Sequence, residues 1–204
     1  MGRYFNLVLV ALGTCVGTAI ASELPEAAKR YIEINYPGYT VDASTSAVGD
    51  IDGDGIPDVA VVCHSRNTKA DYHAKLFVLR GSHGSFSLLA ASKNSSAPQH
   101  GAELEIRGRS LYINKFHSGD GTMNNFYQSQ FQYRNARLVL IGTEETHEAT
   151  SQPPRGDPYM DTSVSTNFLT RVVITTNKRK GKIVKTSKTR LSPAQLTALD
   201  DYEI

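Results

Sequence analysis

The pattern of apolar and polar residues changes once along the chain, near residue 38. Residues 22–36 place Leu24, Ala28, Tyr31 and Ile32 on one face of a predicted helix. From residue 39 onward the apolar residues alternate or form short runs between tight turns, which is typical of antiparallel strands. The expected strands are 39–48, 58–64, 74–80, 85–91, 103–107, 110–116, 124–133, 137–142, 162–168, 170–176 and 183–189.

Many short strands with tight turns predict a mainly β fold. It would be an antiparallel sandwich, an open barrel or a small propeller-like domain, with one short helix at each end. Residues 93–101 and 144–160 are polar and contain proline, so we expect surface loops there. The second helix is expected near the C-terminus, because Ser192 suits a helix cap, Pro193 a first helical position and Gln195 a capping box.

The first residues of the chain have the pattern of an export signal. Arg3 precedes an apolar stretch over 7–13, and Ala19-Ile20-Ala21 forms a small-x-small cleavage site. We therefore expect residues 1–21 to be a signal peptide and residues 22–204 to form a single exported domain. Residues 12–15 also resemble a lipobox, and lipidation of Cys15 would attach the protein to a membrane.

The charge balance and the cysteine content limit which classes of function the chain could have. The chain has 22 Lys and Arg against 20 Asp and Glu, a net +2, which is too balanced for a protein that coats nucleic acid. The basic residues of 178–190 predict either a solvated edge or a surface for an acidic partner. Cleavage after Ala21 would leave Cys63 as the only thiol, and its apolar neighbours predict that it is buried.

One segment carries a specific chemical motif. Residues 50–58 read D-x-D-x-D-G-x-x-D, with Gly55 at the sixth position, where a metal-binding loop turns sharply. Crowded carboxylates repel one another, and a bound divalent cation cancels this repulsion. Ca²⁺ suits such a loop better than Mg²⁺, because Mg²⁺ gives up its hydration waters reluctantly. An acidic turn without metal is the alternative. The expected Ca²⁺ ligands are the side chains of Asp50, Asp52, Asp54 and Asp58 and the carbonyl oxygen of Ile56.

No nucleophile motif, zinc motif or phosphate-binding loop occurs, so we expect a protein that is not an enzyme. A glycine-rich connection between two strands is the candidate for partner recognition, although an ordinary hairpin loop has the same composition. It contains His117, Ser118, Gly119 and Asp120, with Tyr127 in the strand that follows.

The metal loop and two further stretches carry a family resemblance. Residues 47–61 (AVGDIDGDGIPDVAV) resemble the calcium loop of integrin-like FG-GAP repeats. Together with residues 131–142 (FQYRNARLVLIG) and 162–170 (TSVSTNFLT), they resemble periplasmic immunity proteins of bacteria-killing type IV secretion systems. Those proteins are similar in fold to I-type lysozyme inhibitors and block lysozyme-like effectors with a Ser-Gly loop near a tyrosine. Ser118-Gly119 is the comparable pair here.

The resemblance implies a periplasmic, calcium-binding immunity protein that inhibits a lysozyme-like or other peptidoglycan hydrolase by blocking its active site. A non-catalytic, FG-GAP-like envelope or adhesion module is the alternative that the calcium loop alone implies. Neither function involves nucleic acid, and a membrane is involved only if Cys15 is lipidated.

Overall fold

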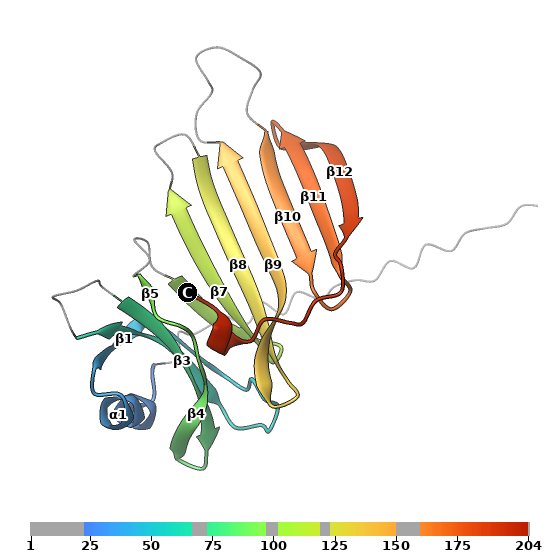
Figure 1. The fold of residues 1–204 in the computed structure, drawn as a ribbon. Helices are drawn as coiled ribbons and strands as arrows, with labels where there is room; N and C mark the ends of the chain where they lie inside the picture. Colours follow the sequence, from blue (N-terminus) through green and yellow to red (C-terminus); the bar gives the residue numbers. More distant parts are fainter. Residues whose placement is uncertain (1–22, 67–72, 97–101, 119–122, 150–159, 204) are drawn as a thin grey trace, which may run out of the picture.

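The computed structural model describes residues 23–66, 73–96, 102–118, 123–149 and 160–203. The predicted signal peptide, with Cys15, lies outside these ranges. The described chain forms two antiparallel sheets and one α-helix, α1 (Glu26–Asn35). The mainly β prediction is therefore confirmed. Because both sheets are open and they pack against each other, the arrangement is that of a sandwich and not of propeller blades (Figure 1).

The smaller sheet has the strand order β1-β2-β3-β4, and a fifth short strand pairs with β3. Helix α1 covers one of its faces, where Ala28 and Ile32 pack against Val59, Val61 and Phe77. The strands are β1 (Tyr39–Gly49), β2 (Asp58–Ser65), β3 (His73–Ser82), β4 (Ser85–Ala91) and β5 (Ser95–Ser96).

The larger sheet is a meander in which every strand pairs with its neighbours in sequence. Three of its hairpins have two-residue turns with positive φ at both positions, such as Lys180-Gly181. The β3–β4 hairpin of the smaller sheet has the same kind of turn at His83-Gly84. The strands are β6 (Ala102–Arg107), β7 (Ser110–Ser118), β8 (Met123–Arg134), β9 (Arg137–Ala149), β10 (Asp161–Asn167), β11 (Val172–Arg179) and β12 (Lys182–Arg190).

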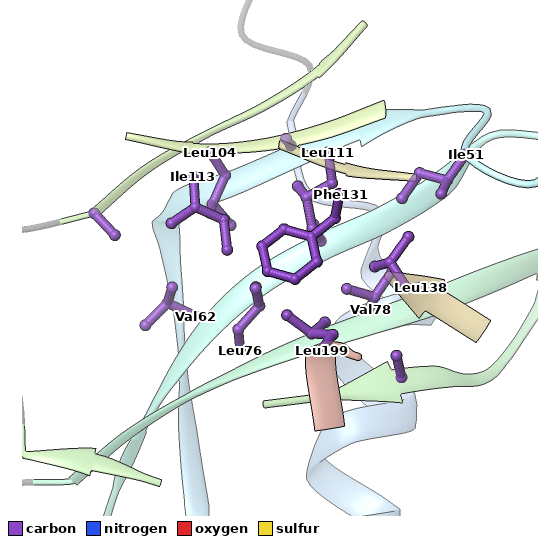
Figure 2. Packing of buried hydrophobic residues seen from close by; sticks show 14 of the residues in the cluster. Ile51, Val62, Leu76, Val78, Leu104, Leu111, Ile113, Phe131, Leu138 and Leu199 are labelled. Carbon is purple, nitrogen blue, oxygen red and sulfur yellow. The ribbon is translucent and has the colours of Figure 1, made fainter. Parts of the chain in front are cut away.

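The main core lies between the second face of the smaller sheet and one end of β6–β9. Figure 2 shows the Phe131 ring among Leu76, Leu104, Ile113 and Leu138, which come from both sheets. The opposite end of the larger sheet extends past this core as a single layer (Figure 1). In β7 the residues from Phe116 onward are exposed, and in β12 all nine residues are exposed.

Two predictions about the second half of the chain are wrong. Residues 144–149 belong to β9 and not to a loop; in this single-layer region both faces meet water, so the strand carries no apolar alternation. The helix predicted at Ser192 is absent. At the end of the stretch 191–198 the Leu140 N–H donates to the Thr197 carbonyl and Ala198 bridges to Val139, so the chain meets β9. Among the described residues near this end, the helical turn is the 3₁₀ turn η1 (Leu199–Asp201).

Candidate functional site

The acidic loop of residues 50–57 joins β1 to β2 and is anchored in the main core. Ile51 is almost fully buried beside Phe131 and Leu138, so the loop cannot move away from the sheet without exposing apolar surface. Gly53 and Gly55 have φ values of +85° and +84°, which other residues rarely adopt. These two glycines let the backbone fold around the aspartate side chains.

Asp58, the first residue of β2, is completely buried and holds the loop through hydrogen bonds to backbone N–H groups. One of its carboxylate oxygens accepts hydrogen bonds from the N–H groups of Ile51 (2.8 Å) and Asp52 (3.3 Å). The other accepts from the N–H of Gly81 on β3 (2.9 Å). Burial raises the pKa of Asp58, although these three N–H donors act in the opposite direction. A nearby cation would stabilise the ionised carboxylate.

Asp50, Asp52 and Asp58 form the metal-binding candidate in the described part of the chain. One carboxylate oxygen of each lies within 4.8 Å of the others, so three hard oxygen donors converge on one point. Asp50 is held by the N–H groups of Gly53 (2.5 Å) and Gly55 (3.1 Å). This triad can hold a metal ion, and its all-oxygen chemistry fits a hard cation.

The triad does not include two further predicted ligands, whose roles stay predictions. Asp54 is not in the converging group; its carboxylate accepts the Ile56 N–H at 2.7 Å within the exposed rim of the loop. The Ile56 carbonyl oxygen, which was predicted from its place in the motif, stays a prediction.

Two arginines, neither expected from the sequence, hold the loop from outside. The Arg80 guanidinium lies 2.6 Å from an Asp52 carboxylate oxygen and donates to the Tyr133 hydroxyl at 2.8 Å. Arg109, in the β6–β7 turn, donates to the Asp52 carbonyl oxygen at 2.8 Å. Its side chain lies over Gly53 so closely that a Cβ there would stand 1.5 Å from a guanidinium nitrogen. The loop thus joins both sheets.

The predicted recognition residues lie at the free end of the β7–β8 hairpin. His117 pairs with Asn125 and Lys115 pairs with Tyr127 in the strand register, so His117 and Tyr127 share the face that continues from the core. Ser118 is the last residue of β7 and points to the opposite face. Gly119 and Asp120 lie outside the described residues.

The register also brings together partners of Tyr127 that sequence reasoning missed. The His147 ring lies 6.0 Å from the Tyr127 ring in an edge-on contact, and its Nδ1 is 2.6 Å from the Asn125 side-chain oxygen. Lys115 lies over the Tyr202 ring, and burial lowers its pKa while Glu203 opposes that shift. The missing signal was the strand pairing, since His147 falls where a loop was predicted.

Cys63 is fully buried on β2, as predicted. Burial raises the pKa of its thiol to about 12, with Asp42 adding to the shift. The basic segment 178–190 forms the exposed β11–β12 hairpin end and edge strand.

Comparison with protein-family models, with curated proteins and with solved structures finds no match. Among the residues that the structure describes, no helix is long and apolar enough to cross a membrane.

Proposed function

We propose that this protein is an exported, calcium-binding inhibitor of a lysozyme-like peptidoglycan hydrolase, and that the β7–β8 hairpin enters the active site of that enzyme. The observation that carries the proposal is the projection of this hairpin beyond the core. Nine cross-strand pairs and the flanking strands β6 and β9 hold it, yet its end residues His117 and Ser118 are exposed. A hairpin fixed in this way loses little conformational freedom on docking.

Calcium is the metal that the loop favours. Three carboxylates and one paired guanidinium leave two negative charges, which a divalent cation would cancel. Backbone N–H groups already occupy part of the carboxylate lone pairs, so the site offers a partial and irregular oxygen set. Ca²⁺ accepts such geometry, whereas Mg²⁺ demands a near-ideal octahedron. Because a calcium ion here would hold the β1–β2 connection against both sheets, its role would be structural.

The chemistry at the hairpin end suits a glycosidase cleft. Glycosidases of the common type use two carboxyl groups that flank the scissile bond. His117 and His147 belong to one cross-strand row on one face of β7–β9, joined through Asn125. Tyr127 lies in the next row on that face, with Lys115 and Glu145. Imidazole and phenol groups can donate hydrogen bonds to carboxylates, and bonds to a charged acceptor are the stronger kind. A partner with acidic catalytic groups would therefore match this face.

The test is protection of peptidoglycan. The protein without residues 1–21 would be mixed with an I-type lysozyme and with each peptidoglycan hydrolase encoded beside its gene, and lysis of cell-wall suspensions would be followed by turbidity. We expect at least one enzyme to be inhibited at stoichiometric protein. Tyr127→Ala should weaken inhibition tenfold or more, whereas Ile34→Ala, at an exposed site on α1, should not. Failure to inhibit any of these enzymes would overturn the proposal.

A further inference from the structure

The outer face of the larger sheet, opposite the core, contains a broad trough. In β7, Leu111 and Ile113 point into the core, so Asn114 and Phe116 point the other way. Their cross-strand partners share this outer face. The trough has a volume of about 490 Å³ and is lined by Asn114, Phe116, Phe126, Gln128, Glu144 and Thr146, with Glu103 at one end. We call it the outer trough.

The outer trough is built from two cross-strand rows of different chemistry. In one row, Phe116 and Phe126 lie side by side with ring centroids 4.9 Å apart, and the two residues are 40% and 41% exposed. In the next row, Gln128 donates to the Asn114 side-chain oxygen at 2.8 Å and stands beside Glu144. The rings thus present apolar surface directly beside a band of amide and carboxylate groups.

A glycine extends the trough along the sheet. Gly142 lies on β9 next to Gln130, and a Cβ there would meet the Thr166 carbonyl oxygen at 3.2 Å. Because that side chain is missing, a second hollow of about 160 Å³ forms, and it shares Gln128 and Glu144 with the outer trough. Five strands, β6 to β10, line the two hollows, which at a strand spacing of about 4.8 Å corresponds to a width of about 19 Å.

The charges around the outer trough select against anionic ligands. Glu103 and Glu144 both line it. Lys115 also touches it, but its ammonium group lies on the opposite face, 5.4 Å from the Tyr202 ring centroid and 3.5 Å from the Glu203 carbonyl oxygen. Among the described residues, the lining therefore supplies two carboxylates and no cation on this face. A phosphate, sulfate or uronate group would meet repulsion here.

We propose that the outer trough binds a neutral oligosaccharide chain. Side-chain amides both donate and accept hydrogen bonds, and carboxylates accept them, so this set matches the paired donor and acceptor character of sugar hydroxyls. The Phe116 and Phe126 rings offer flat apolar surface to the C–H faces of a sugar ring. An elongated, shallow site of this width fits several rings in a chain better than one small molecule.

The phenylalanines and amides of this site point away from the hairpin face proposed to meet a hydrolase, and Lys115 and Tyr127 border the trough from that other face. The proposal does not depend on enzyme inhibition.

The test is titration of the protein without residues 1–21 by four tetrasaccharides, followed by amide NMR shifts and calorimetry. The probes are chitotetraose, cellotetraose, maltotetraose and the anionic tetragalacturonate. We expect at least one neutral probe to bind and to shift amides of β7, β8 and β9, and tetragalacturonate to bind at least tenfold more weakly. If no neutral tetrasaccharide binds at 10 mM, on the order of the weakest useful affinities, the proposal is wrong.

Matched variants locate the site. Phe126→Ala should weaken binding tenfold or more, Phe126→Tyr should restore it, and Gln128→Ala should weaken it several-fold. Asn125→Ala removes an amide from the adjacent position of β8 on the opposite face and should change affinity less than twofold. An unchanged melting temperature would show that each variant folds. If Phe126→Ala and Gln128→Ala leave sugar binding unchanged, the assignment is wrong. It is also wrong if these variants lose binding to a hydrolase while the unaltered protein binds no sugar.

Discussion

Removing calcium should destabilise the protein by an amount that can be estimated beforehand. Extracellular calcium modules bind with dissociation constants of about 10⁻⁴–10⁻³ M. A ligand that binds only the folded state adds RT ln(1 + [L]/Kd), which at 10 mM Ca²⁺ gives about 1.4–2.7 kcal/mol. For a domain of this length, each kcal/mol moves the melting temperature by about 2–4 °C, so the shift between EDTA and calcium should be about 3–11 °C.

The variant that tests the site is Asp50→Asn. Gly53 and Gly55 donate to different oxygens of Asp50, so asparagine keeps an acceptor for only one of these two N–H groups, and it removes one of the converging charges. Asp58 is less suitable, because three N–H groups depend on its carboxylate. We expect Asp50→Asn to lose the calcium-dependent shift, measured by circular dichroism or scanning calorimetry.

The matched control is Asp42→Asn. Asp42 lies in β1 and is not part of the triad. Its carboxylate accepts hydrogen bonds from the Ser44 N–H and the Thr45 hydroxyl. This variant should melt lower and keep the full calcium increment. Identical melting in EDTA and in calcium, or an undiminished shift in Asp50→Asn, would refute the metal assignment.

Two further outcomes follow from the same region. Gly53→Ala and Gly55→Ala both place alanine at a strained positive φ, but only Gly53 faces Arg109. Gly53→Ala should therefore lower the free energy of unfolding by about 1 kcal/mol more than Gly55→Ala, measured by chemical denaturation. Equal losses would show that the Arg109 contact is unimportant. The Cys63 thiol pKa of about 12 lies above the unfolded value, so the folded state holds the proton more tightly and stability should fall as pH rises from about 9 to 12. Cys63→Ser should flatten that decline, and rapid alkylation of native Cys63 at pH 8 would contradict its burial.

Much of the fold could be predicted because every strand except the short β5 pairs with a neighbour in sequence. Alternation located β1 to β4 and β6 to β8 to within one or two residues, and the turn residues marked the hairpins. The alternation of apolar and polar residues did not predict the structure where the chain leaves the buried core. The end of β9 has no apolar alternation because both of its faces are partly exposed. Near residue 198 the chain pairs with β9 through Thr197 and Ala198, whereas a short isolated helix at 192 would be only marginally stable.

The candidate site divides in the same way. Asp50, Asp52 and Asp58 converge because nine consecutive residues carry them, and this local spacing is readable in the sequence. Arg80 and Arg109 reach the loop only because β3 and the β6–β7 turn are brought beside it by packing of the two sheets. Asp54 stays a predicted ligand; its side chain accepts the Ile56 N–H at the rim and is not one of the three that converge.

The local origin of the acidic triad has a consequence for how the molecule is assembled. The β1–β2 hairpin contains all three carboxylates, so an ion could be captured once this hairpin closes and before the second sheet exists. Hairpins form in microseconds, whereas burial of Asp58 needs β3 in place. A divalent cation would then screen the crowded carboxylates early and help to nucleate folding. The cation concentration would therefore affect the rate of refolding as well as the final stability.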